Sequence, residues 1–309
     1  RKIGQSRHHL MQTYMSHTPV LLHEAIDNLN LGQRKVFFDA TLGGGGHSNY
    51  VNSKFDGKIT IVGTDKDCDA VARVHSLLPN AHLACAPFSK IDEVLESYNL
   101  TSIDAALFDL GISSFQLDTS GRGFSFQKDE PLLMTMKRDP NDDDITAKDI
   151  VNLWSEETLA DIIYAYGEER YARRIAKAIV EARNNAPIET TKQLADIVAK
   201  VVPSTFGKKI HPATKTFQAL RIVVNKELEE IKIGLRKALG YLSEGGRIAA
   251  ISFHSLEDRI VKDIFKEAEE EGVGKRITKK PLTPSEQEVK MNPRSRSAKL
   301  RIFEKTNHV

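Results

Sequence analysis

The sequence predicts an α/β fold in which a mostly parallel sheet is interrupted by an inserted helical domain. Short apolar runs of strand length alternate with helix-like stretches, which is typical of a parallel sheet covered by helices. The alternation then stops between about residue 113 and about residue 244, a gap too long for one crossover connection. The predicted strands are Lys35–Ala40, Lys58–Asp65, His82–Ala86, Ile103–Leu110, Gly246–Phe253 and Lys299–Glu304.

The long gap is predicted to be helical. Apolar residues recur at helical spacing in Ala160–Tyr166 and Arg174–Val180, and Thr190 is a capping residue before a further such stretch. A chain of 309 residues exceeds one typical domain. We therefore expect three parts: an N-terminal extension at 1–16, a main α/β domain formed by 17–114 and 216–309, and a helical insert domain at 115–215.

A glycine loop follows the first predicted strand. Four consecutive glycines, Gly43–Gly46, let the backbone approach a ligand without a Cβ in the way. Asp65 ends the second strand, where a carboxylate suits the diol of a ribose. A dinucleotide fingerprint would need a third glycine where Ser48 or Asn49 stands, and no P-loop pattern is present. An adenosine-containing ligand is therefore expected, and a glycine-rich turn without a ligand is the alternative.

Charge is unevenly distributed along the chain. The whole protein carries a net charge of +2, but from Val273 onward ten Lys or Arg residues oppose three acidic residues, a net charge of +7. Such a segment predicts a polyanionic partner, and a merely solvated tail is the alternative. No apolar run approaches the length of a membrane span, so no membrane partner is expected.

The two cysteines and the N-terminus carry less information. Cys68 and Cys85 form neither a CxxC pair nor a metal-ligand spacing, and no metal site is expected. We predict two small buried or half-buried side chains in a reduced, cytoplasmic protein. Residues 1–16 are basic and polar, do not begin with Met, and are left out of the fold prediction.

The motifs, taken in order, resemble one family. From His17 to about Asn307 the chain is similar to the bacterial small-subunit ribosomal RNA cytosine-N4 methyltransferases (RsmH/MraW type). It departs from that family's pattern at Phe115, Leu133, Thr135 and Lys215. The motifs that carry the resemblance are His17–Leu22, Gly43–Ser48, Phe108–Ser114, Gln116–Asp118, Arg122–Phe126, Tyr166–Arg170, His211–Thr214, Thr216–Arg221, Ser252–Arg259 and Asn292–Ser297.

The resemblance implies a class I S-adenosylmethionine methyltransferase with a Rossmann-like sheet. Asp65 would hold the ribose, Phe88 would pack on the adenine, and a side chain at Gly45 would fill space that the cofactor needs. For His47 an incidental imidazole, with only the backbone used, stays open. The cofactor-binding residues it implies are Gly45, Gly46, His47, Asp65, Phe88, Asp109 and Gln116.

Two residues are predicted to be catalytic. Asp109 follows an apolar strand, where amino-methyltransferases place an acceptor for the target amine, and a structural carboxylate is the alternative. His254 follows the fifth strand, and a purely structural hydrogen bond is equally open. The implied reaction is methylation of the N4 amine of a cytidine in the decoding centre of 16S ribosomal RNA.

A set of basic residues is predicted to contact phosphates around a flipped-out cytidine. Arg221 could instead pair with Glu227 on a helix. The expected partner is small-subunit ribosomal RNA or the assembling subunit, with a homodimer as the default. A methyltransferase for another amine (tRNA, DNA or protein) and a non-catalytic RNA-binding assembly factor are the alternative functions. The predicted RNA contacts are Lys208, Lys209, Lys215, Arg221, Arg294 and Arg296.

Overall fold

The computed structural model describes residues 19–33, 35–138, 140–141, 143–203 and 211–306. The chain divides into two compact units. Among the described residues, the α/β unit comprises those up to Gly111 and those from Leu228 onward, and the helical unit comprises Ile112–Glu227. The predicted insert at 115–215 is thus wider in the structure, since it begins at Ile112 and ends at Glu227. The predicted extension at 1–16 lies outside the described residues. None of the described helices is long and apolar enough to cross a membrane.

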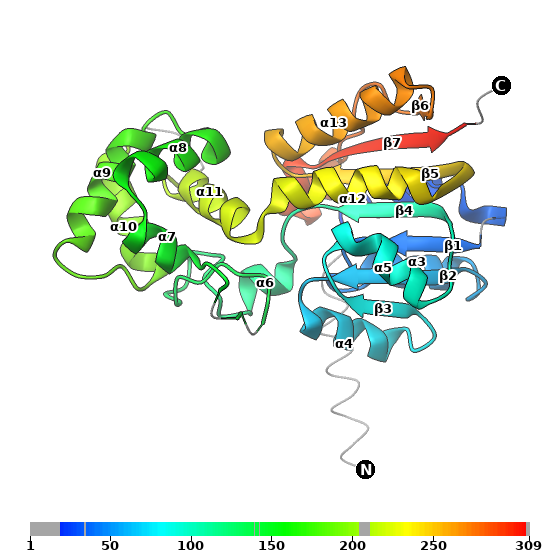
Figure 1. Ribbon diagram of the computed structural model, residues 1–309, viewed down its shortest axis with the longest axis horizontal. Helices are drawn as coiled ribbons and strands as arrows, with labels where there is room; N and C mark the ends of the chain where they lie inside the picture. Colours follow the sequence, from blue (N-terminus) through cyan, green and yellow to red (C-terminus); the bar gives the residue numbers. More distant parts are fainter. Residues whose placement is uncertain (1–18, 34, 139, 142, 204–210, 307–309) are drawn as a thin grey trace, which may run out of the picture. The chain divides into compact units, whose positions relative to one another are not determined.

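The α/β unit is built on a seven-stranded sheet in the order β3-β2-β1-β4-β5-β7-β6 (Figure 1). The first five strands pair in parallel, whereas β7 pairs antiparallel with both β5 and β6. All six predicted strands are present, and β6 was missed because three residues are too few to show a pattern. The strands are β1 (Val36–Asp39), β2 (Thr60–Asp65), β3 (His82–Cys85), β4 (Ile103–Asp109), β5 (Leu242–Ser252), β6 (Gly274–Arg276) and β7 (Lys299–Lys305).

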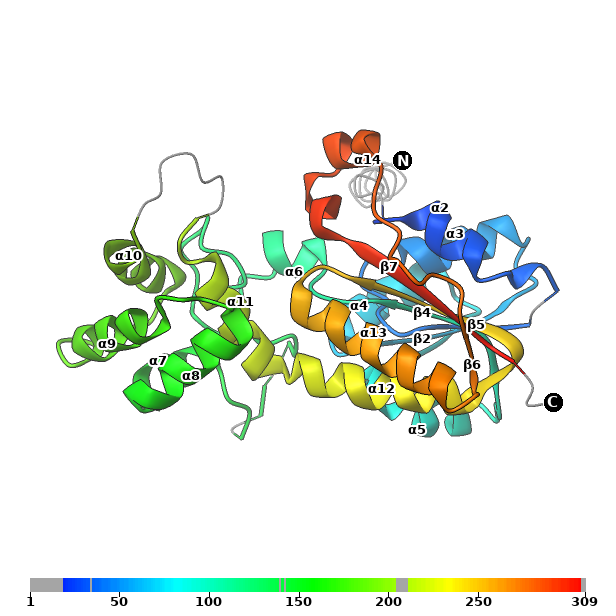
Figure 2. The ribbon, with the colours of Figure 1, turned by 90° about the horizontal axis from the view of Figure 1, so that it is seen from above.

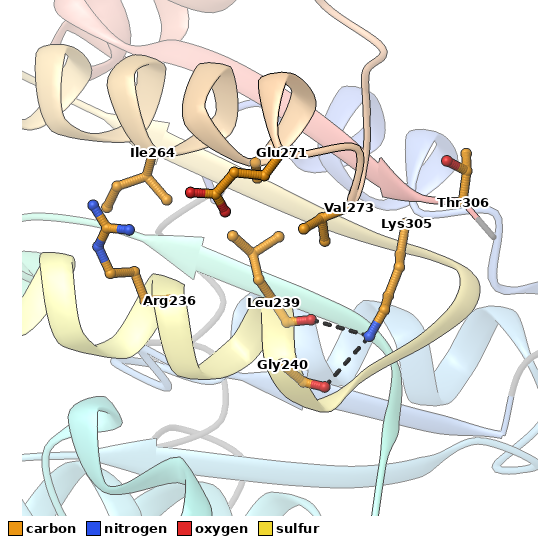
Figure 3. A pocket seen from close by; sticks show the side chains of 9 residues that line it. Arg236, Leu239, Gly240, Ile264, Glu271, Val273, Lys305 and Thr306 are labelled. Carbon is orange, nitrogen blue, oxygen red and sulfur yellow. Dashed lines mark hydrogen bonds between the residues drawn. The ribbon is translucent and has the colours of Figure 1, made fainter. Parts of the chain in front are cut away.

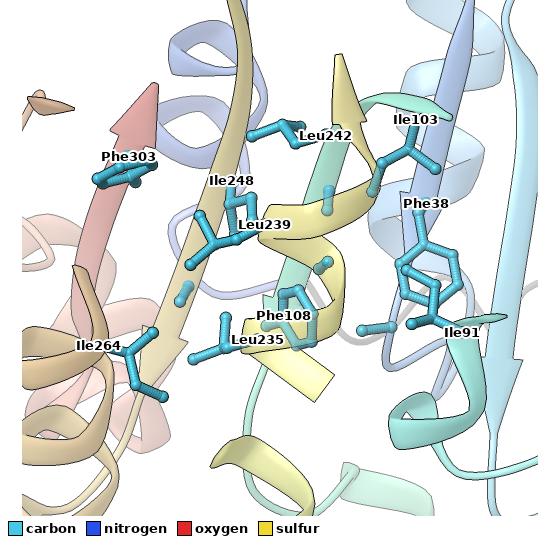
Figure 4. Packing of buried hydrophobic residues seen from close by; sticks show 14 of the residues in the cluster. Phe38, Ile91, Ile103, Phe108, Leu235, Leu239, Leu242, Ile248, Ile264 and Phe303 are labelled. Carbon is cyan, nitrogen blue, oxygen red and sulfur yellow. The ribbon is translucent and has the colours of Figure 1, made fainter. Parts of the chain in front are cut away.

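Helices cover both faces of the sheet (Figure 2). Successive strand residues point to opposite faces, so Phe38 packs with α5 (Ile91–Ser97), α12 (Glu227–Tyr241) and α13 (Ser255–Glu270), as Figure 4 shows in part. Its neighbour Phe37 packs on the other face. That face is covered by α2 (Leu22–Asn28), α3 (Gly46–Lys54) and α4 (Cys68–Leu77).

The parallel pairing brings three aspartates to one edge of the sheet. Asp39, Asp65 and Asp109 each end a strand, and the register places Asp39 opposite Leu107 of β4. The strand order reverses between β1 and β4, which is the position where open α/β sheets bind ligands. The carboxyl edge at this switch point is therefore the place to look for a site.

The helical unit has its own apolar core. Both predicted helical stretches are confirmed, in α8 and α9, and Thr190 caps α10 with a capping box. The last helix of this unit is α11, and the predicted boundary at residue 216 places nearly all of it in the main domain. Its helices are α6 (Ser114–Asp118), α7 (Ala147–Leu153), α8 (Glu156–Gly167), α9 (Ala172–Arg183), α10 (Thr191–Val201) and α11 (Thr214–Asn225).

The prediction that the two cysteines are buried or half-buried and reduced is wrong. Cys68 and Cys85 are both exposed and are joined by a disulfide, with their Cα atoms 5.0 Å apart. Cys68 begins α4 directly after β2, and Cys85 ends β3, which is the neighbour of β2. The parallel pairing of β2 and β3 therefore brings together two residues that the sequence separates by 17 positions.

Candidate functional site

The glycine loop is tied to the end of β2. The N–H of Gly43 donates to Asp65 Oδ2 at 2.8 Å, and the N–H of Asp67 donates to Asp65 Oδ1 at 2.8 Å. Burial raises the pKa of Asp65. Each carboxylate oxygen retains a further lone pair. Asp65 can therefore hold the loop and still accept a hydrogen bond from a ribose.

The loop glycines differ in what surrounds them. Gly45 has a φ of +74°, and a Cβ there would lie 2.9 Å from Val74 Cγ2. A Cβ on Gly46 would lie 2.4 Å from Pro19 Cγ, whereas one on Gly44 would meet nothing within 4 Å. A Cβ at Gly45 would therefore meet Val74, and the cofactor contact of Gly45 stays a prediction. The open side of the loop is at Gly44.

The ring of His47 is buried and anchored. Its Nε2 lies 3.2 Å from the carbonyl oxygen of Val20, and its Nδ1 lies 3.7 Å from Asp109 Oδ2. Burial lowers the pKa of His47 to about 4, so the ring is neutral near pH 7. Next to Val20, the N–H of Leu21 donates to Glu288 Oε1 at 2.8 Å. The N-terminal motif therefore supports the glycine loop, a role that the sequence analysis missed.

Asp109 stands among other acidic groups. Its pKa is raised to about 8 by burial and, less strongly, by the charges of Asp39 and Glu257. Asp39 accepts a hydrogen bond from the hydroxyl of Ser48 at 2.5 Å, and burial raises its pKa to about 6. The N–H of Asp109 donates to Thr41 Oγ1 at 2.8 Å. Asp39 was not predicted as a site residue, although its place at the end of β1 was a usable signal.

His254 caps a helix. Its Nδ1 accepts from the N–H of Glu257 at 3.4 Å, while the Glu257 carboxylate accepts from the N–H of Phe253 at 2.8 Å. The N–H of His254 also donates to Glu257 Oε2 at 3.4 Å, which completes a capping box at the start of α13 and gives the ring a structural role. They favour the structural alternative, and the catalytic role of His254 stays a prediction.

Phe88 is only half-buried, but its ring is already in contact with the core. It packs edge-on against Phe108, with ring centroids 5.4 Å apart, and a Cβ on Gly234 of α12 would lie 2.4 Å from it. Gln116 belongs to the helical unit, where its Oε1 accepts from the N–H of Ser113 at 3.0 Å in a capping box. The cofactor contacts of both residues stay predictions.

The predicted RNA contacts fall into three groups. Arg294 and Arg296 are exposed in the 3-10 helix η3 (Pro293–Ser297), whereas Lys208 and Lys209 lie outside the described residues. Lys215 donates to the carbonyl of Glu168 at 2.6 Å. Arg221 is mostly buried and makes two hydrogen bonds to Glu227, at 2.8 and 2.9 Å. Arg221 therefore forms the alternative pairing, and Arg294 and Arg296 are better placed for phosphates.

Part of the basic C-terminal segment is neutralised within the α/β unit. Asp258 pairs with both Lys299 and Arg301, Glu304 pairs with Lys275, and Arg276 pairs with Glu269. These ion pairs form because β6 and β7 are neighbouring antiparallel strands and α13 packs beside them. The other cations of the segment that are exposed in the structure are Lys279, Lys280, Lys290, Arg294 and Arg296.

A cavity of about 450 Å³ lies between α12, α13 and the end of β7 (Figure 3). Lys305 donates there to the carbonyls of Leu239 and Gly240, at 3.4 Å each. Because β7 runs antiparallel to β5, this is the amino-terminal edge of the parallel strands. The cavity contains none of the predicted site residues and is separate from the carboxyl-edge site.

Comparison with known proteins shows the family of the chain. The model of the MraW methylase family matches residues 14–306, nearly the whole chain. The chain belongs to the MraW methylase family. The predicted class of protein, a class I S-adenosylmethionine methyltransferase, is thereby confirmed.

Relatives of this MraW-family chain carry one common name. Ribosomal RNA small subunit methyltransferase H from Caldicellulosiruptor bescii is 47% identical, over 94% of this chain and 99% of the relative. The protein of the same name from Sulfurihydrogenibium sp. is 48% identical, over 93% and 98%. The solved rRNA methylase from Streptococcus thermophilus is 12% identical over 96% of each chain, with a TM-score of 0.41, too low to support further argument.

Proposed function

We propose that the protein transfers a methyl group from S-adenosylmethionine to small-subunit ribosomal RNA, and that the acceptor is the N4 amine of a cytidine in the decoding centre of 16S RNA. The observation that carries the proposal is the carboxyl edge of the sheet. There a glycine loop, held by Asp65, lies beside the half-buried acid Asp109 at the switch point between β1 and β4. The names of the relatives support the RNA substrate.

The cofactor would lie along this edge. Asp65 would accept hydrogen bonds from the ribose hydroxyls, as the charge-assisted acceptor at the end of β2. The open side of the loop at Gly44 would admit the methionine part of the cofactor, near the N-terminus of α3. A helix N-terminus offers unpaired N–H groups that suit the carboxylate of the methionine part.

Asp109 would serve the target amine. The lone pair of cytosine N4 is delocalised into the ring, which makes it a weak nucleophile. An acceptor that takes an N–H hydrogen bond orients the amine for in-line attack on the sulfonium methyl. In the reaction the new N–C bond forms as the S–C bond breaks, and the amine then loses one proton. Asp109, which accepts the N–H hydrogen bond of the amine, would receive this proton.

The RNA would be held by the exposed cations of the C-terminal segment, Lys279, Lys280, Lys290, Arg294 and Arg296. A base stacked inside a helix does not reach a cofactor at the edge of a sheet, so a flipped-out cytidine is expected. A cytoplasmic location belongs to this proposal. A homodimer has no support from the single chain or from the comparisons.

Mass mapping of small-subunit RNA tests the proposal. RNA from cells lacking the gene should lack one methyl group on one cytidine of 16S RNA, and the purified protein should restore it in a reaction that consumes S-adenosylmethionine. The Asp109→Ala variant, if folded, should not restore it. Methylation of tRNA, DNA or protein instead would show a different amine substrate. Unchanged RNA mass together with impaired subunit assembly would point to a non-catalytic assembly factor.

A further inference from the structure

The hydrogen-bond partner of His47 fixes which nitrogen carries the proton. The carbonyl oxygen of Val20 can only accept, so Nε2 of His47, 3.2 Å away, must carry the hydrogen. In the neutral ring Nδ1 then presents a lone pair, and it faces Asp109 Oδ2 at 3.7 Å. Two acceptor atoms thus face each other across this gap whenever Asp109 is ionised.

The acidic groups around Asp109 also disfavour its ionised form. Asp39 at the end of β1 and Glu257 on α13 are both acidic, and His254 on α13 lies against Glu257. Asp109 Oδ1 is buried and has no hydrogen-bond partner among the described residues. The surrounding side chains therefore compensate an ionised Asp109 poorly. Either a proton on Asp109 or a cation beside it would offset this negative charge.

We propose that Asp109 and His47 form a one-proton pair that distinguishes the sulfonium cofactor from its thioether product. The proposal rests on the function proposed above, since it places the sulfonium at this edge of the sheet. Without cofactor the pair holds one proton, on Asp109. Binding of the positively charged sulfonium compensates the carboxylate, so the O–H bond of Asp109 breaks and the proton passes to solvent.

Methyl transfer then returns Asp109 to its protonated form. When the S–C bond breaks, the sulfonium becomes a neutral thioether and its compensating charge disappears. The proton that the target amine loses returns to Asp109, which restores the resting pair beside a neutral product. S-adenosylhomocysteine therefore binds the protonated pair, whereas S-adenosylmethionine binds the ionised one. His47 acts as a positioning residue, because its Nδ1 lone pair favours the protonated form of Asp109.

The pKa values set the pH range of the effect. With the pKa of Asp109 raised to about 8 and that of His47 lowered to about 4, the pair keeps its proton on Asp109 at pH 7. Below pH 8 the affinity for S-adenosylmethionine should rise on the order of tenfold per pH unit. The affinity for S-adenosylhomocysteine should stay nearly constant over the same range.

Titration calorimetry on the full chain tests this at pH 7 in two buffers of different ionisation enthalpy. We expect about one proton released per bound S-adenosylmethionine and about none per S-adenosylhomocysteine. Equal proton counts for the two ligands, in a protein that binds both, would overturn the inference and leave the proposed function standing. Failure to bind either ligand at any pH would instead remove the proposed function itself.

Two variants separate the parts of the pair. Asp109→Asn should abolish the proton release. His47→Gln retains an N–H donor for the Val20 carbonyl but removes the Nδ1 lone pair, so the pH midpoint of S-adenosylmethionine binding should move to lower pH. An unchanged midpoint in a folded His47→Gln protein would remove His47 from the pair, and continued proton release in Asp109→Asn would remove Asp109.

Discussion

Asp65 Oδ2 accepts a hydrogen bond from the N–H of Gly43 at 2.8 Å. The carboxylate predicted to bind the ribose therefore also fixes the glycine loop that would receive the rest of the cofactor. Two parts of the candidate site, 22 residues apart in the chain, are thus coupled through one side chain. Substitution of Asp65 should affect both parts at once.

Asp65→Ala should weaken S-adenosylmethionine binding by about 1.5–3 kcal/mol, because a charge-assisted acceptor is lost. Calorimetry gives the affinity, and circular dichroism checks the fold. Glu93→Ala, which removes an exposed carboxylate from α5, is the matched control and should bind normally. Unchanged affinity in a folded Asp65→Ala protein would refute the assignment of Asp65.

Gly44→Ala and Gly45→Ala should behave in opposite ways. Alanine at Gly45 meets Val74 at a positive φ, so the free energy of unfolding should fall by about 1–3 kcal/mol. Alanine at Gly44 meets no protein atom within 4 Å, so stability should persist while cofactor affinity drops. Urea unfolding and calorimetry on both variants measure this. If Gly44→Ala binds S-adenosylmethionine normally, the cofactor does not contact the loop at Gly44.

Asp109→Asn should stabilise the protein above neutral pH. An aspartate whose folded-state pKa is raised from 3.8 to about 8 binds more protons folded than unfolded, so its contribution to stability falls as pH rises from 4 to 8. Asparagine does not ionise, so the variant does not lose this stability as pH rises. Each unit of pKa difference corresponds to about 1.4 kcal/mol of free energy of unfolding. Denaturant unfolding should show a gain that is larger at pH 8 than at pH 5, by several kcal/mol. An equal effect at both pH values would contradict the raised pKa.

Replacing Arg294 and Arg296 with Ala should weaken binding to small-subunit RNA and leave cofactor affinity intact. The slope of log affinity against log salt should flatten by about one per lost phosphate contact. Arg236→Ala, an exposed arginine beside the cavity at the amino-terminal edge, is the matched control. A double variant with the parent's slope would show that this segment is solvated surface.

Arg221→Ala should act on stability instead of the salt slope. The change leaves Glu227 buried without the arginine that holds it, so unfolding should become easier by about 3–5 kcal/mol. Thermal unfolding and RNA titration of the same variant separate the two effects. A flatter salt slope with unchanged stability would restore Arg221 as an RNA contact.

The Cys68–Cys85 disulfide should protect the protein against unfolding. Closing a loop between residues 17 positions apart is worth about 3 kcal/mol in unfolded-chain entropy. Reduced protein and the Cys68→Ser/Cys85→Ser variant should unfold at the same, lower denaturant concentration. Thiol titration of the unreduced, denatured protein should find no free thiol. Two free thiols there would contradict the pairing.

The sequence by itself determined six of the seven described strands, the presence of a helical insert and the edge of the sheet at which the candidate site lies. Strand patterns are local, and parallel strands bring their carboxyl ends to one edge, so Asp65 and Asp109 could be placed from the chain alone. The same reasoning could have found Asp39.

Only the tertiary structure decided which atoms meet. Three examples are the disulfide, the contact between Gly45 and Val74, and the contact between His47 and Val20. In each, the local sequence carries no sign of the partner. The partners are set by strand register and helix packing across the chain. Burial then sets the pKa of Asp109, because the loss of water around a carboxyl depends on every segment that covers it.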